Sequence, residues 1–174
     1  MLPAPIPTDE KVRLQALEKL QILDTEPEQR FDDITKEAIN YFQVPLATIS
    51  IIDEKREWHK SCQGMCETKE GSRDISFCGH ALLSEFIFII EDTKLDPRFV
   101  DNPYVTGSPF IRFYAGMRLL DYQTKQPIGV FCIKDIKPRK LSVTDIDAFI
   151  ELANRAEQEI NKSEIIRTKP DASI

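Results

Sequence analysis

The chain has 174 residues, of which 41% are hydrophobic, and it carries a formal net charge of -6 at pH 7. This length suits one domain with a sizeable core, and the acidic balance argues against nucleic acid or an anionic membrane as the main partner. No apolar run is long enough to cross a bilayer, and the N-terminus lacks the pattern of a secretory signal. We therefore expect a cytoplasmic protein whose cysteines, four in number, are reduced.

The N-terminal quarter predicts an extended leader, residues 1–8, and two helices. Thr8 is followed by two acidic residues and is a good helix start, because its hydroxyl can cap the first turn. Thr25 and Glu28 have the spacing of a capping box, which predicts the start of a second helix. That helix should end before Pro45, because a proline disfavours helical backbone in the residue before it.

The middle of the chain alternates between β-branched runs and polar turns, a pattern typical of an antiparallel sheet. Two runs flank a turn-like segment and predict a hairpin. A third run is apolar on both faces and predicts an interior strand, and two more predict a pair joined across a loop. In the same order, these runs are Ala47–Asp53, Glu57–Gln63, Phe86–Glu91, Tyr114–Leu120 and Pro127–Asp135.

Two further helices follow from capping signals. Ser76 suits the N-cap of a short helix that ends near Leu83. Ser142 and Asp145 form a capping box that predicts the start of a longer C-terminal helix.

Together these elements predict an α+β fold. Hairpin-linked strands with helices before and after them indicate an antiparallel sheet of about five or six strands, covered on one face by the terminal helices. The other face is left to the short helix and to the long loop that begins at Asp96 and runs into the strand ending at Leu120. We expect this aromatic-rich loop to fold over a cavity. The domain should span residues 9–162, followed by a flexible tail, residues 163–174.

Six segments, in order along the chain, resemble the GAF domains, which are small-molecule-binding sensory modules of signalling proteins. The resemblance extends from about Arg13 to Asn161 and is greatest to the bacterial subgroup that precedes histidine kinase or diguanylate cyclase domains. The segments are Leu23–Thr35, Ile49–Gly64, Ser72–Leu82, Ile89–Val105, Ile111–Leu120 and Pro127–Asp135.

The resemblance implies a GAF-like sheet of about six strands, a ligand pocket under the loops, and a homodimer formed through the terminal helices. No output domain follows in this sequence, so we expect the module to act on a signalling protein in trans. The signature of the cyclic-nucleotide-binding members is missing as a unit, so a cyclic nucleotide is not the expected ligand. Which small molecule binds is not predicted.

We expect the pocket to have aromatic walls, a few polar groups and a floor provided by the sheet. The predicted ligand-binding residues are Phe77, Cys78, His80, Arg98, Phe99, Asn102, Arg112, Phe113, Tyr114 and Cys132, with Phe131 as an alternative to Cys132. A second interpretation is that Arg98 and Asp101 tie the loop down and that Phe99 plugs the core. The pocket is then filled, and the module is a ligand-free dimerisation or interaction domain.

The pattern formed by Cys62, Cys66, Cys78 and His80 invites a zinc interpretation, but the last two residues are too close to be two ligands on one helical face. Buried cysteines that act as small apolar residues are the simpler interpretation, so no metal or cofactor is predicted. A redox interpretation stays open, because Cys78 in the first turn of a helix should have a lowered pKa.

The SFCGHA segment also resembles the free methionine-R-sulfoxide reductases, an enzymatic branch of the same fold. Their nucleophilic cysteine lies in the later long loop, and this chain has no cysteine between Cys78 and Cys132. No catalytic residue is therefore predicted, and His59 is expected to be a surface residue of its strand. We expect a sensory or regulatory ligand-binding module in signal transduction rather than an enzyme, with a cysteine-based redox sensor or reductase as the alternative.

Overall fold

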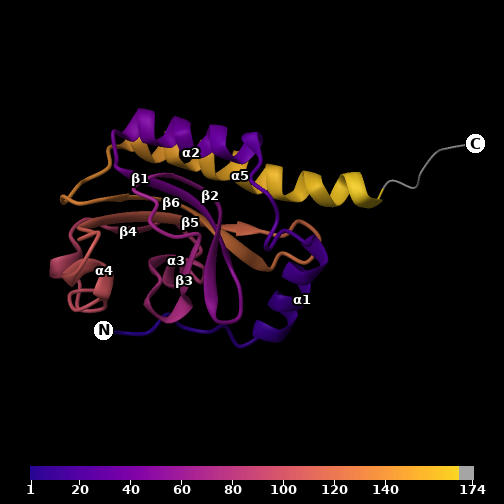
Figure 1. Cartoon of the computed structure of the whole chain (residues 1–174), viewed down its shortest axis with the longest axis horizontal. Helices are drawn as coiled ribbons and strands as arrows, with labels where there is room; N and C mark the ends of the chain where they lie inside the picture. The colour runs from indigo at the N-terminus through magenta and orange to yellow at the C-terminus, as the bar shows by residue number, and fades with distance from the viewer. Residues whose placement is uncertain (169–174) are drawn as a thin grey trace, which may run out of the picture.

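The computed structural model describes residues 1–168 of the chain and the side chains of residues 1–162. Two long helices, α2 and α5, cover one face of a sheet, and short helices and loops cover the other face (Figure 1). The helices are α1 (Glu10–Leu20), α2 (Gln29–Phe42), α3 (Phe77–Ala81), α4 (Pro103–Thr106) and α5 (Val143–Thr168). The strands are β1 (Leu46–Ile52), β2 (Arg56–Gly64), β3 (Glu70–Ser72), β4 (Phe88–Ile90), β5 (Phe113–Leu120) and β6 (Pro127–Asp135).

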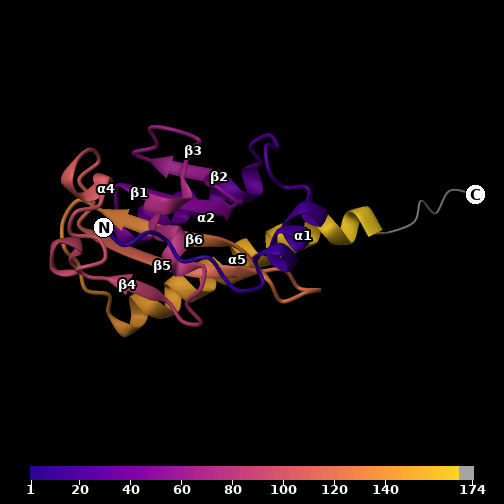
Figure 2. The ribbon, with the colours of Figure 1, turned by 90° about the horizontal axis from the view of Figure 1, so that it is seen from below.

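The strands form one sheet of six in the order β3-β2-β1-β6-β5-β4, and every neighbouring pair is antiparallel (Figure 2). The predicted α+β class, the β1–β2 hairpin and the β5–β6 pair are therefore confirmed. Among the helices within residues 1–168, none combines the length and apolar character that a bilayer crossing requires.

The prediction that Phe86–Glu91 forms an interior strand is wrong. The strand is only three residues long, Phe88–Ile90, and it lies at the edge of the sheet, where it pairs with β5 alone. Phe86 is outside the strand and 80% exposed. The run is apolar on both sides because both faces of the sheet are covered even at this edge: Ile89 packs on the helix side, and Phe88 packs on the loop side.

Both predicted caps of the N-terminal helices are also wrong. Helix α1 begins at Glu10 after Asp9, without a side-chain cap from Thr8. Helix α2 begins at Gln29 rather than just after Thr25. The hydroxyl of Thr25 instead donates to the Ile22 carbonyl at 2.6 Å and accepts from the Lys60 ammonium at 2.8 Å. The buried ammonium needs acceptors, and the threonine supplies one of them.

The other two capping predictions are confirmed. The Ser76 hydroxyl accepts from the Gly79 amide at 3.0 Å at the start of α3. At the start of α5, the Ser142 amide donates to the Asp145 carboxylate at 2.9 Å, and the Asp145 amide donates back to the Ser142 hydroxyl at 3.1 Å. Helix α2 ends at Phe42, before Pro45, as predicted.

The leader lies across the loop-covered side of the molecule (Figure 2). Its Leu2 amide donates to the Arg98 carbonyl at 3.3 Å, and its Ala4 amide donates to the Asp74 carbonyl at 3.0 Å. At the other end, α5 continues to Thr168, past the predicted start of the tail. Residues 169–174 of that predicted tail lie outside the described residues.

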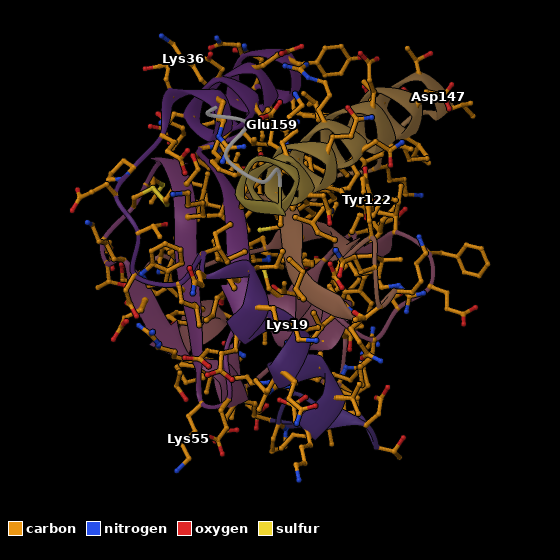
Figure 3. The ribbon with its side chains drawn as sticks, turned by 90° about the vertical axis from the view of Figure 1, so that its right-hand side faces the viewer. Lys19, Lys36, Lys55, Tyr122, Asp147 and Glu159 are labelled. Atoms are coloured by element: carbon orange, nitrogen blue, oxygen red, sulfur yellow. A yellow bond between two sulfur atoms is a disulfide. The ribbon has the colours of Figure 1, made fainter. Side chains whose placement is uncertain are left out.

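Two separate apolar clusters stabilise the sheet, one on each face. The helix-side core lies under α2 and α5, whose Lys36 and Asp147 point outward on the far side (Figure 3). Its larger members include Phe31, Ile49, Phe113, Phe131 and Phe149. The loop-side core includes Phe77, Cys78, Phe99, Tyr114 and Cys132.

Candidate functional site

A cavity of about 80 Å³ lies on the loop-covered face, over strands β1, β2 and β6. The loop after β2 and the segment around α4 also contribute to its wall. The lining side chains are Leu46, Thr48, Glu57, His59, Cys62, Met65, Cys66, Glu67, Thr68, Phe77, Tyr104, Pro109, Ile111 and Lys134, together with the backbone of Gly71.

The strands carry polar residues onto this face because their side chains alternate between the two sides of the sheet. Thr48 and Ser50 of β1 face the loops, whereas Ile49 and Ile51 face the helices. Ser50 is paired with His59 across the β1–β2 ladder, so the imidazole lies on the same face. Such polar positions within buried strands need hydrogen-bond partners or a ligand.

Glu57 is the most constrained group in the cavity. It is 5% exposed, and its Oε2 accepts a hydrogen bond of 2.6 Å from the Ser76 hydroxyl. Its Oε1 has no hydrogen-bond partner among the described residues. Burial acts to raise the pKa of this carboxyl, but the positive charge of Lys134, the nearby His59 and the Ser76 hydroxyl outweigh it and lower the pKa to about 2. Glu57 is therefore ionised.

Lys134 supplies the opposite charge and is 9% exposed. Its Nζ lies 6.0 Å from the centre of the Tyr114 ring and forms no hydrogen bond or ion pair with any residue that the structure describes. Burial acts to lower the pKa of this lysine, but its interactions with the nearby Cys132 and Glu57 outweigh burial and raise the pKa. A carboxylate and an ammonium thus face one small cavity without pairing.

His59 lines the cavity, so the prediction of a surface histidine is wrong. Its Nδ1 lies 2.9 Å from the Ser50 hydroxyl, and the chain of contacts continues to Thr48 at 2.9 Å and from there to Cys132 Sγ at 3.0 Å. Burial lowers the pKa of His59, the Glu57 carboxylate acts to raise it, Lys134 acts to lower it, and the net shift is downward. A neutral imidazole is therefore favoured near pH 7.

Cys78 and Cys132 form a buried pair beneath the cavity, with their sulfur atoms 3.6 Å apart. The Tyr114 hydroxyl donates to Cys78 Sγ at 3.2 Å. The predicted lowering of the Cys78 pKa is wrong, because complete burial raises the pKa of this thiol. Helix α3 has only five residues, so its dipole does not overcome the loss of solvation.

Cys62 and Cys66 are joined by a disulfide at the cavity wall (Figure 3, yellow bond). The expectation that all four cysteines are reduced is therefore wrong for these two. The disulfide also removes both of them as zinc ligands in this state. Cys78 and Cys132 do behave as predicted for buried, small side chains.

Five of the predicted site residues gather in the loop-side core, and one of them, Phe77, reaches the cavity. The Phe77 ring is stacked between Phe99, at 4.7 Å, and Tyr114, at 5.2 Å, measured between ring centres. Cys78 and Cys132 lie next to these rings. The second interpretation, in which Phe99 plugs the core, describes this part of the loop correctly.

The polar residues predicted for the pocket are used within the loop instead. Arg98 pairs with Asp96 at 2.6 Å rather than with Asp101, and Arg112 pairs with Asp92 at 2.9 Å. Asn102 caps α4 by accepting from the Tyr104 amide at 2.9 Å, and its Nδ2 donates to the Ile75 carbonyl at 2.9 Å.

Two more predicted site residues lie away from the cavity. His80 Nε2 lies 3.1 Å from the Leu2 carbonyl, under the leader. Phe113 belongs to the helix-side core, as does Phe131. Phe113 and Tyr114 are adjacent in a strand, so they point to opposite faces and cannot both line one pocket.

Four residues that line the cavity were not predicted from the sequence: Thr48, Glu57, Tyr104 and Lys134. A signal was present in β6, where Lys134 directly follows an apolar run, whereas Glu57 lies among other polar residues of β2. An ionisable residue within a buried strand is costly unless it is paired or functional, and that rule points to the site.

Comparisons with known proteins agree with this architecture. The chain is 40% identical over 139 residues to a cyclic di-GMP phosphodiesterase of Pseudomonas aeruginosa, and the match covers 80% of this chain but 23% of that protein. The chain therefore spans about a quarter of the length of this curated relative.

Solved structures share the fold at low identity. The GAF domain of a phosphoenolpyruvate-protein phosphotransferase from Coxiella burnetii has a TM-score of 0.66 and 13% identity, covering 90% of this chain and 97% of that one. The free methionine-R-sulfoxide reductase of Neisseria meningitidis, solved with its substrate, has a TM-score of 0.62 and 14% identity, covering 97% and 99%. The GAF domain family itself matches residues 26–160. The chain thus belongs to the GAF domain family, whose members are sensory domains of signalling proteins.

Proposed function

We propose that this domain is a regulatory sensor that binds a small molecule in the cavity between β1, β2, β6 and the loops. The observation that carries the proposal is the pair of opposite buried charges, Glu57 and Lys134, which face the cavity without contacting each other. Buried charges are costly when unpaired, and a bound ligand would supply the missing partners. The domain senses rather than catalyses, and it acts in the cytoplasm.

The contacts that would transmit ligand binding to the helices lie at the end of β6. Asp135, which follows Lys134, forms an ion pair with Arg139. The guanidinium of Arg139 in turn donates to the carbonyls of Phe42, at 2.9 Å, and Gln43, at 2.7 Å, at the end of α2. A ligand that favours one position of Lys134 would therefore favour one of two arrangements of α2 and the adjoining α5. The shift between these arrangements would be set by the difference in the ligand's affinity for them.

The terminal helices are the surface on which we place dimerisation and the contact with a signalling protein in trans. Helices α2 and α5 lie side by side on one face of the sheet, and the C-terminal part of α5 extends past the sheet (Figure 1). A ligand-driven movement of these helices would directly change the contacts at such an interface.

Native mass spectrometry tests the proposal together with thermal denaturation in a library of small metabolites. We expect one class of compound to raise the melting temperature, because a ligand that binds only the folded state stabilises it. A Lys134→Gln variant should lose that response. Absence of stabilisation by every compound, with no bound molecule in the native spectrum, would contradict ligand binding, and a monomeric mass would contradict dimerisation alone.

A second candidate function, redox sensing, is favoured by the sulfur separation of 3.6 Å between Cys78 and Cys132. Hydrogen peroxide would take two electrons and two protons from the two thiols. The S–S bond would form, the O–O bond would break, and two molecules of water would leave. Mass spectrometry of peroxide-treated protein would detect the loss of two hydrogens, and the Cys78→Ser variant would not show it. Two thiols that remain titratable after treatment would exclude this function.

A further inference from the structure

We propose that the cavity takes a small zwitterionic amino acid, whose ammonium group binds Glu57 and whose carboxylate binds Lys134. This assignment rests on the proposed ligand-binding function and narrows the ligand to one chemical class.

The arrangement of the strands keeps the two protein charges apart. Glu57 is paired with Ile52 at one end of β1, and Lys134 is paired with Leu46 at the other end, on the opposite neighbouring strand. Ser76 holds one oxygen of Glu57 at 2.6 Å, which fixes the direction of the carboxylate. A ligand that carries both charges can bridge the two groups.

The carboxylate end of the site calls for a cationic donor. The Oε1 atom of Glu57 is buried and has no partner within the described part of the chain. A cationic donor would both form a charge-assisted hydrogen bond with this oxygen and balance the buried negative charge. A metal ion is a poorer candidate, because the described residues contain no cluster of three or more histidines, cysteines or carboxylates. An ammonium group needs only the free oxygen.

The ammonium end of the site calls for a monoanion. Lys134 brings one positive charge, and the nearby Thr48 and Tyr104 are polar but uncharged. A phosphate would bring up to two negative charges into a cavity that already holds the negative charge of Glu57, so it is disfavoured. A carboxylate balances Lys134, and the whole zwitterion leaves the net charge of the cavity unchanged.

The size of the cavity limits the rest of the molecule. A volume of about 80 Å³ is well below the roughly 300–1,000 Å³ of pockets for drug-sized ligands, which favours a compact ligand over a nucleotide or a tetrapyrrole. The apolar wall formed by Leu46, Phe77 and Ile111 is suited to a short aliphatic portion between or beside the two charges.

Binding of defined probes to the unmodified protein provides the first test, by chemical-shift titration of backbone amides. Glycine, L-alanine, β-alanine and γ-aminobutyrate carry both charges at different spacings, whereas acetate carries only the anion and methylamine only the cation. We expect at least one of the four zwitterions to shift amides of β1, β2 and β6 and to bind about tenfold or more tightly than either single-charge probe. Equal or tighter binding of acetate or methylamine would overturn the assignment.

Matched variants provide the second test. Glu57→Gln and Lys134→Gln should each weaken the best zwitterion about tenfold or more. The exposed Glu85→Gln and Lys137→Gln make the same chemical changes away from the cavity and should bind as the unmodified protein does. A spectrum with dispersed amide signals verifies that each variant is folded, and unchanged binding in a folded Glu57→Gln would also overturn the assignment.

The outcomes separate this inference from the function on which it rests. If a metabolite without an ammonium or without a carboxylate binds in the cavity and no zwitterion does, the amino-acid class is wrong but the sensory function stands. If no compound of any class binds, both are wrong.

Discussion

The helix-covered and loop-covered faces of the sheet differ in what the same strands present to them. In β1, Ile49 and Ile51 pack under the helices, whereas Thr48 and Ser50 face the loops and take part in a chain of polar contacts. The first face is filled with apolar side chains. The second face combines a smaller aromatic core with a cavity that holds buried charges. One face therefore supplies stability, while the other holds buried charges that are costly to desolvate.

The largest expected effect is on the helix-covered face. Phe131→Ala removes a fully buried ring that lies 4.9 Å from Phe149, measured between ring centres, and should lower the free energy of unfolding by about 3–5 kcal/mol. Urea denaturation measures this loss. Phe86→Ala is the matched control, since Phe86 is exposed, and it should change the free energy by well under 1 kcal/mol, about 0.5 at most. Equal losses of unfolding free energy in the two variants would show that the buried Phe131 ring stabilises the protein no more than the exposed Phe86 ring does.

Glu57 should make stability depend on pH in a way that its amide variant does not. The folded-state pKa of about 2 lies below the ordinary value of 4.5, so the stabilising contribution is complete above pH 4.5 and is lost as the pH falls toward 2. The loss amounts to about 3 kcal/mol. The difference in unfolding free energy between the natural protein and Glu57→Gln should shrink over this range. Glu85→Gln provides the reference, and an unchanging difference would mean that Glu57 is not held ionised.

The two serine caps allow a direct comparison of the faces. Ser142→Ala removes an exposed capping bond of α5 and should cost about 1 kcal/mol. Ser76→Ala removes the cap of α3 and also deprives the Glu57 carboxylate of the hydrogen bond from the Ser76 hydroxyl, so it should cost about 2–3 kcal/mol. Thermal or urea denaturation of both variants ranks them. The reverse order would show that solvent reaches Glu57 freely.

Reduction of the Cys62–Cys66 disulfide should have a small effect on overall stability and the most local effect of these changes. The two cysteines are only four residues apart, so the bond closes a short loop and contributes about 2 kcal/mol or less. We expect hydrogen exchange to increase in the loop that follows β2 and to remain unchanged in α2 and α5. Increased exchange in those helices would show that the two faces are coupled through this loop.

Much of the fold could be predicted from local patterns. The β1–β2 hairpin, the β5–β6 pair and the caps at Ser76 and Ser142 depend on residues close together in sequence, where periodicity and capping rules apply. The strand at Phe88–Ile90 was misplaced because an apolar run reveals burial but not the number of neighbouring strands.

The site was harder to predict because its residues come from distant segments. Arg98 and Arg112 have the chemistry of ligand-binding groups, but nearby Asp96 and Asp92 already pair with them. Glu57 and Lys134 could not be placed together from the sequence, since only the strand order brings them to one cavity. The spacing of residues along a strand indicates which side chains share a face. It does not indicate which of them will lack partners.

The irregularity in the β1–β2 ladder between Ile49 and Ser50 has a consequence for both faces. On β2, His59 and Cys62 both face the loops, although residues three apart in a regular strand point to opposite sides. Ser61 faces the helices, where its hydroxyl bonds Asp32 and Thr35 of α2. One extra residue in β2 thus reverses the alternation of side chains between the two faces for the residues that follow it. If β2 kept every residue but paired without this bulge, everything that follows would change sides, with Ser61 toward the cavity and Cys62 toward the helices. The single additional position in β2 therefore keeps the anchoring of α2 and the wall of the cavity in register with each other.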